Sequence, residues 1–523
     1  MRIVTNPSNP STLPLSVPKF DDRHYLDSNP KVMEAIRAGT ADNALDHFIR
    51  FGIDENRYPL IRREAGPLQA AVERYIVSES GFCLILGWLA DEGVDPPRLR
   101  LYGGEFNIEL PPAVVLRHAR RDVEDHIKGG AYDYGYVIFG QSPSKSLLKQ
   151  PVLFQVNTLA GTFQSKITPE VVSDKRLMDT LLQVVASYEF HAGKEVSLNA
   201  FLTGPAGDSL YRLFQMNVAS AISAPYVERF RPRPVSCSFV TVLFGSTEPI
   251  NLQPLLFNAA KVDFGEWIYV CNSPEDAATV LRYARLISDL YDVMITVIVL
   301  GDNAGFGAAN NVAIENAASH RIFIMNPDVH VMPTYAAGLQ QMLSDEDLGT
   351  TLWGGLLFYD DHNLMHSGMY LEKDSFVRRN SLNRNDTTSS HCGLLRVEHF
   401  DKGVPYVESD WSRSRPVPAI TGAVMVFNRE GFDKLGGFST RYIYGHYEDA
   451  DLSMRWRDSV GDVAIHPKLR LVHLEGQGSR ARGEEFRGAA LSNRYFFTAQ
   501  HGATFDAHRD ELGKTNALAT AER

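Results

Sequence analysis

The spacing of apolar and polar positions changes several times along the chain. Residues 1–20 are rich in Pro, Ser and Asn and show no periodic pattern, which predicts a flexible arm. Between residues 21 and 64, apolar positions such as Val32 and Ile36 recur at helical spacing, and Gly39 stands where a helix would end. We therefore expect a small helical module over residues 21–64.

Residues 65–232 have a different pattern. Residues 75–89 are rich in β-forming side chains, and residues 99–102 and 106–110 alternate around a Gly-Gly pair, which indicates a hairpin. Residues 197–202 also resemble a strand, while residues 169–190 have helical spacing. We predict a β-rich, sandwich-like accessory domain. Because it carries no convergent acid or metal cluster, we expect it to serve binding or homo-oligomer contact, with a structural spacer equally open.

After the Arg231-Pro232-Arg233-Pro234 linker, strand-like and helical runs alternate as far as residue 500. Strands are predicted near residues 238–244, 267–270, 296–300 and 322–325, and amphipathic helices lie between them. Such alternation is typical of a doubly wound α/β sheet with mostly parallel strands. We assign residues 233–500 to this domain and residues 501–523 to a C-terminal tail.

Composition and charge narrow the function classes. The 523 residues are 44% hydrophobic and 22% charged with a net charge of −11, which argues against a general nucleic-acid binder. No apolar run approaches the roughly 20 residues of a membrane span, and the N-terminus lacks a secretory signal pattern. The four cysteines are widely spaced and fit neither a disulfide framework nor a zinc site. We expect a cytoplasmic protein.

The first stretch with candidate chemistry follows a short apolar run. Residues 322–325 predict a buried strand that stops at Asn326-Pro327-Asp328, and His330 comes two residues later. Ligands of open α/β sheets bind beyond the carboxyl ends of strands. Asp328 and His330 could therefore reach one divalent cation. The alternative is a polar turn in which Asp328 makes an Asx-type bond.

Other strand ends carry polar residues as well. Phe244-Gly245, Asn272 and Asn303 each follow a predicted strand and could share one rim, where they would form a nucleotide pocket. Asn303-x-Gly305 precedes a predicted helix, whose N–H groups favour anionic oxygens. Alternatively, the glycines only shape a turn.

Glu448, Asp449 and Asp451 crowd the predicted first turn of a helix. A cap and the helix dipole need only one acid, so three of them suit a general base. His473 follows a strand-like run one structural unit later and could be a further metal ligand. A histidine in this position could also be a satisfied structural residue.

Taken together, these stretches resemble a family 2 glycosyltransferase of the GT-A fold over residues 236–500. Two departures from the family pattern, Asn326 in place of the first motif acid and Asn310 in place of an Arg, are shared with the branch similar to rhamnosyl- and galactofuranosyltransferases. The residues that carry the resemblance are 239–245, Asn303-x-Gly305-x-x-x-Ala309-Asn310-Asn311, Asn326-Pro327-Asp328, Thr421-Gly422-Ala423, Gly436-Gly437-Phe438, 447–452 and His473-Leu474-Glu475-Gly476-Gln477.

The resemblance implies an inverting, metal-dependent hexosyl-type transferase with a nucleotide-sugar donor and Mn²⁺ or Mg²⁺. It implies that Asp449 is the general base and that Glu448 orients the acceptor. Asp328 and His473 would bind the metal; His330 competes, because Asp328-x-His330 is similar to the Asp-x-His of polypeptide N-acetylgalactosaminyltransferases. The remaining assignments place the donor at Phe244, Gly245, Asn272, Asn303, Gly305, Asn310, Asn326 and Asp328, and the acceptor at Thr421, Gly422 and Trp411.

The expected role is bacterial surface polysaccharide synthesis on a glycan or lipid-linked glycan acceptor, with peripheral association at the inner membrane left open. One alternative is a catalytically inactive GT-A domain that binds carbohydrate. A second is a sugar nucleotidyltransferase, which would usually carry a Gly- and Arg-rich loop after its first strand. Gly245-Ser246-Thr247-Glu248 matches that loop poorly.

Overall fold

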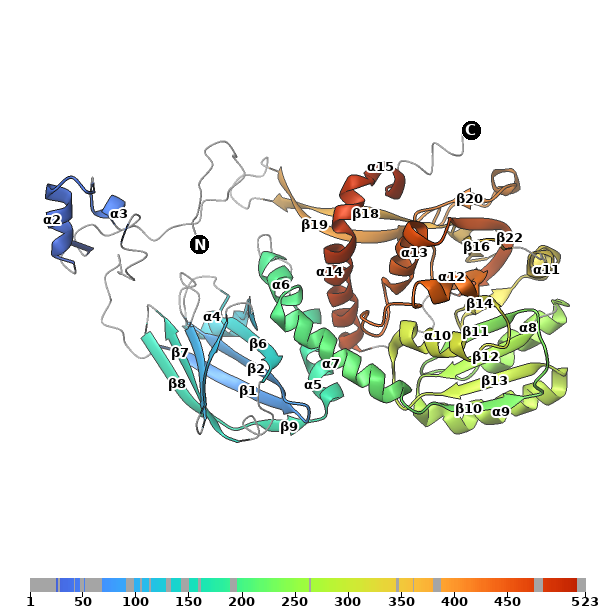
Figure 1. Ribbon diagram of the computed structural model, residues 1–523, viewed down its shortest axis with the longest axis horizontal. Coiled ribbons are helices and arrows are strands. Elements are labelled where there is room, and N and C mark those ends of the chain that lie inside the picture. Colours follow the sequence, from blue (N-terminus) through green and yellow to red (C-terminus); the bar gives the residue numbers. More distant parts are fainter. Residues whose placement is uncertain are drawn as a thin grey trace.

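The computed structural model describes most of the chain between residues 25 and 514 (Figure 1). The predicted arm, residues 1–20, lies outside the described residues, and in the predicted helical module the helices α2 (Lys31–Arg37) and α3 (Ala44–His47) pack around Tyr25, Val32 and Ala44. The described residues are 25–26, 29–41, 43–47, 51, 68–90, 98–103, 106–111, 114–127, 133–142, 150–158, 161–188, 195–262, 265–344, 348–360, 362–379, 387–474 and 483–514.

Two β-sheets pack face to face in the accessory region. Apolar side chains such as Ile85 and Phe154, one from each sheet, fill the shared core. The five-stranded sheet runs in the order β5 (Val115–His118), β6 (Gly135–Gln141), β2 (Phe82–Leu89), β1 (Ala70–Ser78), β9 (Glu170–Val172). The four-stranded sheet runs in the order β4 (Phe106–Leu110), β3 (Arg98–Gly103), β7 (Val152–Thr158), β8 (Gly161–Ile167), and the short helix α4 (Arg121–Ile127) follows β5.

Three helices cover the other face of the five-stranded sheet: α5 (Asp174–Ala186), α6 (Glu195–Leu202) and α7 (Pro205–Ile222). The Ser173 hydroxyl caps α5 by accepting a hydrogen bond from the Arg176 N–H. The prediction of a strand at residues 197–202 was wrong, because this segment belongs to the helix α6. Its buried residues Leu198, Phe201 and Leu202 have the i, i+3, i+4 spacing of a helix.

The C-terminal half contains an 11-stranded mixed sheet with the predicted alternation of strands and helices. The expectation of mostly parallel strands was wrong for the sheet as a whole, because more of its strand pairs are antiparallel than parallel. The main path is β10 (Tyr226–Phe230), β13 (Met294–Val299), β12 (Glu266–Cys271), β11 (Ser238–Leu243), β14 (Arg321–Met325), β21 (Val424–Asn428), β16 (Leu352–Phe358), β22 (Val463–His473), β15 (Val329–Val331). The strands β11 to β14 are mutually parallel, and β21 runs antiparallel to β14. Two short strands, β17 (Leu364–His366) and β20 (Arg415–Pro416), pair with β16 and β22.

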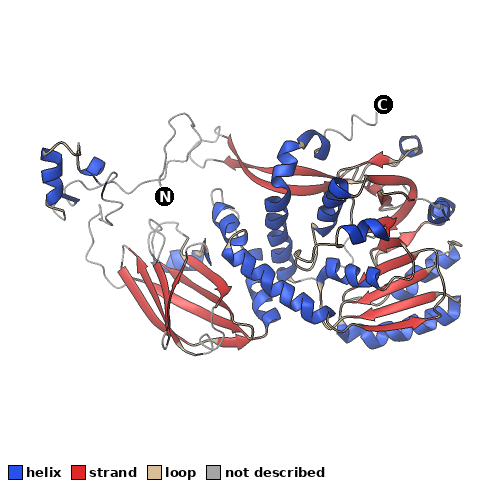
Figure 2. Cartoon of the chain, viewed as in Figure 1, coloured by secondary structure: helices blue, strands red, loops and turns tan. Residues whose placement is uncertain are grey.

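Side chains alternate between the two faces of this sheet, so successive strand residues enter different cores. Phe239 and Trp267 pack under α8 (Pro249–Ala259), α9 (Ala277–Tyr291) and α11 (Ala336–Ser344). Val240 and Ile268 belong to the core that contains α10 (Gly305–Glu315), α12 (Arg429–Lys434) and α13 (Glu448–Ser459). Figure 2 shows the strands of this half enclosed by helices.

The long helix α14 (Glu484–Ala507) lies between α5 and α13 and joins the two halves (Figure 1). A Cβ on Gly488 would lie 1.9 Å from the Leu182 carbonyl oxygen, so only glycine allows this close crossing with α5. Another part of α14 packs against the ribbon of β18 (Met369–Arg379) and β19 (Thr387–His399), and α15 (Arg509–Leu512) follows. Among the described residues, no helix is long and apolar enough to span a bilayer.

The core therefore crosses both predicted domain boundaries. β10 precedes the Pro-containing linker, yet it pairs antiparallel with β13 at the edge of the large sheet. Side chains of α5 and α7 share one core with β11 and β12. At the other boundary, α14 continues to Ala507, and His501 from the predicted tail bonds to Asp451 on α13.

Candidate active site

The ends of β11, β12 and β13 meet in a hydrogen-bond network formed by predicted donor-site residues. Asn272 is buried, and its amide donates to Asn303 Oδ1 at 2.8 Å and accepts from the Ala304 N–H at 2.9 Å. Asn303 Oδ1 also accepts from the Gly305 N–H, and the Gly245 N–H donates to Ser273 Oγ. The rim expected from the sequence is thus a connected surface in the structure.

Gly305 links this rim to the segment before α13. Its φ of +80° lies in the left-handed region, and a Cβ there would lie 3.2 Å from Tyr444 Cα. The next residue, Phe306, donates its N–H to the Tyr444 carbonyl at 2.8 Å. The start of α10 is therefore fixed directly against the turn that leads to the predicted acids.

A buried glutamine that the sequence analysis did not identify holds the turn after β14. Gln253 on α8 donates its amide to the carbonyls of Asn326 and Val329, at 2.8 and 3.1 Å. On the other side, the Asn326 N–H donates to the Ala423 carbonyl at 3.0 Å. The polar turn around Asp328 is therefore fixed from both sides.

Asp328 and His473 come together at the end of this turn. Val329 pairs with His473 across β15 and β22, and His473 Nε2 lies 3.1 Å from Asp328 Oδ1. That distance allows an ion pair, but the geometry is not that of a hydrogen bond, because Asp328 Oδ1 is a buried oxygen without a hydrogen-bond partner. An oxygen and an imidazole nitrogen, close together and otherwise unused, are suitable ligands for a divalent cation.

His330 is a buried neighbour of this pair. Burial is the main cause that lowers the pKa of His330; the nearby Asp328 opposes the shift, and the neighbouring His473 imidazole adds to it. The neutral imidazole that results is the form that binds metals. However, no three His, Cys, Asp or Glu side chains in the described part of the chain converge closely enough to hold a metal ion. Two protein ligands suffice only where substrate phosphates and water supply the others.

Asp449 lies in the first turn of α13 and contacts the segment 421–423. Its Oδ2 accepts the Gly422 N–H at 2.9 Å, and its Oδ1 accepts the Ala450 N–H at 2.8 Å. A Cβ on Gly422 would lie 3.0 Å from the Phe306 ring and 3.5 Å from Asp449 Cβ. Glycine at 422 thus allows the acid, the ring and the strand end to approach one another.

Residues 421–423 connect the two acidic stretches. The Ala423 carbonyl bonds to the turn that carries Asp328, and the Gly422 N–H bonds to Asp449. Met325 also pairs with Val424 across β14 and β21. The two stretches, about 120 residues apart in sequence, are therefore neighbours on one edge of the sheet.

Glu448 is buried at the start of α13, beside Asp449. The turn before it has three non-glycine residues in the left-handed region: Tyr444, His446 and Tyr447, with φ values of 59°, 76° and 74°. Such dihedrals are unfavourable for residues with a Cβ and persist only where the surroundings hold them.

Three predicted site residues have other contacts. Trp411, in the short helical turn Glu408–Trp411, is 5% exposed, and the Arg415 guanidinium covers its ring, so it packs in the core and is not a surface for an acceptor. Asn310 is 0% exposed and donates to the Phe306 carbonyl of its own helix. Phe244 packs against Phe486 at the start of α14, with ring centroids 5.7 Å apart.

A second residue that the sequence analysis missed is Asn493 on α14, whose amide bonds to the backbone of residues 443–446. No local pattern distinguishes it from other polar residues of α14. Gln253, in contrast, occupies an apolar position of α8, and a polar side chain on a buried helix face could have indicated it.

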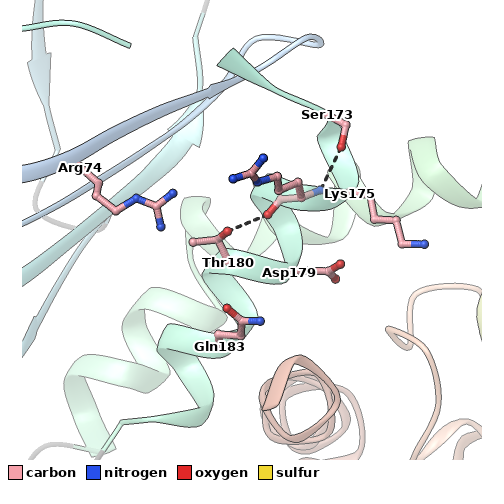
Figure 3. A pocket seen from close by; sticks show the side chains of 7 residues that line it. Arg74, Ser173, Lys175, Asp179, Thr180 and Gln183 are labelled. Atoms are coloured by element: carbon pink, nitrogen blue, oxygen red, sulfur yellow. Dashed lines mark hydrogen bonds between the residues drawn. The ribbon is translucent and has the colours of Figure 1, made fainter. Parts of the chain in front are cut away.

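The described residues also form a cavity of about 430 Å³ away from this edge (Figure 3). It is lined by Arg74 of β1 and by side chains of α5, among them Lys175, Arg176 and Asp179. None of the predicted site residues lines it. The basic side chains are paired, since Arg74 and Arg176 contact Glu170 and Lys175 contacts Asp302.

Comparison with known proteins places part of this edge in a described family. Residues 403–476 match the family model described as the N-terminal domain of galactosyltransferase. The matched segment includes Thr421, Gly422, Asp449 and His473. The chain therefore contains a glycosyltransferase-like domain.

Individual proteins show more distant similarity. The chain is 23% identical over 178 residues to the O-antigen biosynthesis protein RfbC of Myxococcus xanthus, covering 34% of this chain and 12% of that protein. It is 22% identical over 250 residues to the uncharacterized protein y4gI of Sinorhizobium fredii, covering 47% of this chain and 23% of that protein. The matches thus span less than a quarter of either curated relative. A structure of GalNAc-T7 with UDP, GalNAc and Mn²⁺ aligns with a TM-score of 0.36 and 14% identity, over 55% of this chain and 54% of that one.

Proposed function

We propose that the protein is an inverting glycosyltransferase that moves a sugar from a nucleotide-sugar donor to a glycan or lipid-linked glycan. The observation that carries the proposal is the bridge formed by residues 421–423, which joins the Asp328–His473 pair to Asp449 on one edge of the sheet. The diphosphate of the donor could bind near the Asp328–His473 pair, and the acceptor could bind beside it at Asp449. The galactosyltransferase-domain match over residues 403–476 supports the same class.

In this proposal Asp449 is the general base. Inverting transfer is a single displacement, so the attacking acceptor hydroxyl must lose its proton as the new bond forms. Each Asp449 oxygen accepts one backbone N–H, and a carboxylate oxygen has two acceptor sites, so lone pairs remain for that proton. In this proposal Glu448 orients the acceptor, and Thr421 and Gly422 line the acceptor site next to Asp449.

The donor would lie along the rim of Phe244, Gly245, Asn272, Asn303 and Gly305, with Asn326 next to it. Asp328 and His473 would hold a divalent cation, since Asp328 Oδ1 and His473 Nε2 lie 3.1 Å apart and Asp328 Oδ1 has no hydrogen-bond partner. The cation, when bound, would neutralise charge on the leaving diphosphate. His330 remains the alternative ligand to His473.

The role that we propose is synthesis of a bacterial surface polysaccharide at the cytoplasmic side of the inner membrane. Its support is the similarity to a protein named for O-antigen biosynthesis.

A nucleotide-sugar panel tests the proposal. UDP- and GDP-sugars are added with Mn²⁺, with Mg²⁺ or with EDTA, and thermal shift and nucleoside diphosphate release are measured with methyl glycosides as acceptors. We expect cation-dependent binding of one donor, release of its nucleoside diphosphate and a product of inverted anomeric configuration by NMR. Binding without turnover would instead indicate a carbohydrate-binding scaffold. Pyrophosphate release from a nucleoside triphosphate and a sugar 1-phosphate would indicate a nucleotidyltransferase.

A further inference from the structure

The turn at residues 442–447 places Glu448 and Asp449, and its conformation needs outside support. Tyr444, His446 and Tyr447 all have positive φ. Such conformations are sparsely populated for residues with a Cβ and persist only where the surroundings hold them. The rest of the protein must therefore supply contacts that this conformation alone can make.

Part of that support comes from Asn493 on α14. Its Oδ1 accepts the Ile443 N–H at 2.8 Å, and its Nδ2 donates to the carbonyls of Ile443 and Gly445, at 3.0 and 2.7 Å. Asn493 is completely buried, so no water can replace these bonds. They fix the backbone of the turn from the inner side.

Further support comes from the accessory helices α5 and α7 and from the start of α14. The Tyr444 hydroxyl donates to Asp179 Oδ1 on α5 at 2.6 Å. The Tyr444 ring also contacts Phe214 on α7 and Phe486 on α14, with centroids 5.8 and 4.9 Å apart. Asp179 and Lys175 project from α5 on the side away from Arg74 (Figure 3). A carboxylate some 270 residues before Asp449 thus holds the side chain at the centre of the strained turn.

We propose that Asp179 is a positioning residue for Asp449, acting through Tyr444, and this inference rests on the function proposed above. The Tyr444 carbonyl accepts the Phe306 N–H, and the Phe306 ring packs on Gly422, which in turn bonds to Asp449. Freeing Tyr444 lets the turn relax toward common dihedrals and moves the base relative to the acceptor. A displacement of about 1 Å from reacting geometry can cost about 10²-fold in rate.

The alternative is that Asp179 only joins the two halves of the molecule. Lys175–Asp302, at 2.7 Å, is such a junction: both side chains are about half exposed, and their hydrogen bonds involve neither Tyr444 nor Asp179. Lys175 lies one helical turn before Asp179 on α5, so Lys175→Ala is a matched control that removes an interface contact and leaves the Asp179–Tyr444 hydrogen bond in place.

The test uses the full chain and five variants: Asp179→Ala, Asp179→Asn, Tyr444→Phe, the double variant Asp179→Ala/Tyr444→Phe and the Lys175→Ala control. Transfer is followed as nucleoside diphosphate release from the UDP- or GDP-sugar that the wild type uses, with Mn²⁺ and methyl glycoside acceptors. We expect Asp179→Ala and Tyr444→Phe each to lower kcat about tenfold or more, with donor KM within about twofold. The double variant should be no slower than the slower single one, because both remove the same bond. Asp179→Asn keeps an acceptor oxygen and should retain most activity, as should Lys175→Ala.

Hydrogen exchange of residues 443–451 provides a readout that needs no substrate. Exchange should be faster in Asp179→Ala and Tyr444→Phe and unchanged in Asp179→Asn and Lys175→Ala. Three results would each overturn the inference. The first is a wild-type kcat in both Asp179→Ala and Tyr444→Phe. The second is a kcat of Asp179→Asn as low as that of Asp179→Ala, and the third is unchanged exchange in all variants. If the wild type turns over no donor, the proposed transfer fails, and the exchange data still decide whether Asp179 controls the turn.

Discussion

Two carboxylates two residues apart on α13 occupy opposite environments. Asp451 faces α14, is fully buried and accepts hydrogen bonds from Arg455, Gln500 and His501, at 2.8, 3.1 and 2.8 Å. Asp449 lies on the other side and accepts only backbone N–H groups, from Gly422 and Ala450. The first acid is fully buried and accepts three hydrogen bonds from side chains, whereas the second keeps acceptor capacity for a ligand.

The difference separates two uses of the same residue type. A buried charge is tolerated only when it is paired and hydrogen-bonded, and once paired it is costly to disturb. A carboxylate that is half-buried and held by backbone alone can exchange partners at little cost. We therefore propose that Asp451 stabilises the fold and that Asp449 takes part in the reaction, and a separate variant tests each proposal.

Asp449→Asn tests the chemical assignment. The Asn amide cannot take up the proton of the attacking acceptor hydroxyl, so we expect turnover to fall by about 10²–10⁴-fold while donor affinity stays within a few-fold. The variant loses one acceptor for a backbone N–H, so unfolding free energy should fall by only about 1 kcal/mol. Steady-state kinetics and urea unfolding measure both quantities. If turnover stays near the wild-type value under conditions where the chemical step is rate-limiting, Asp449 is only a helix cap, and Glu448 becomes the candidate for the general base.

Asp451→Ala tests the structural assignment. Removing one partner of a buried ionic group leaves Arg455 and His501 uncompensated, and we expect a loss of about 3–5 kcal/mol in unfolding free energy. Asp458→Ala, at an exposed acid on the same helix, is the control and should stay within about 0.5 kcal/mol. Donor binding by folded Asp451→Ala should remain close to wild type. A stable variant that has lost turnover would reverse the two roles.

Asp328→Ala extends the comparison to the other acidic stretch. We expect it to weaken nucleoside diphosphate binding about tenfold or more in Mn²⁺, because Asp328 supplies the oxygen ligand, and to change binding little in EDTA. Isothermal titration in the two buffers makes the measurement. Equal affinity in both buffers, for wild type and variant alike, contradicts a cation at Asp328 and His473.

His366 on β17 provides a third kind of buried polar group, one that is kept neutral. Burial, the main cause, lowers its pKa well below 6.5, and the neighbouring imidazoles of His399 and His473 add to this. The unfolded chain then binds the extra proton below about pH 6.5, so stability falls as pH falls, by up to about 1.4 kcal/mol per pH unit for this group. His366→Asn should reduce the slope of unfolding free energy between pH 7 and 5. An unchanged slope would contradict this account.

The sequence predicted those parts of the molecule that depend on local patterns. The strand-and-helix alternation after residue 234 is present in the large sheet, and the polar residues that follow β11, β12, β13 and β14 lie at one edge, because parallel strands end together. Chain order also suggested that Asp328 and His473 act together, and the structure places them 3.1 Å apart. Their chemical roles remain predictions.

Long-range contacts could not be predicted in this way. Asn493 and Asp179 act on a turn 50 and 265 residues away, and nothing in their own neighbourhoods indicates it. The α6 helix was mistaken for a strand because the apolar residues Leu198, Ala200 and Leu202 also fit the two-residue alternation of a strand. The boundary near residue 232 was expected at the prolines, whereas the strand pairing of β10 takes the sheet past them.

The crossing of α5 and α14 also has a consequence during synthesis. About 300 residues separate the end of α5 from the start of α14. At roughly 5–20 residues per second, a ribosome needs about 15–60 s to supply the second helix after the first. Throughout that interval the surface of α5 around Leu182, which later receives Gly488, has no partner from its own chain. This face of α5 therefore waits for its α14 partner until the last part of the chain has been made.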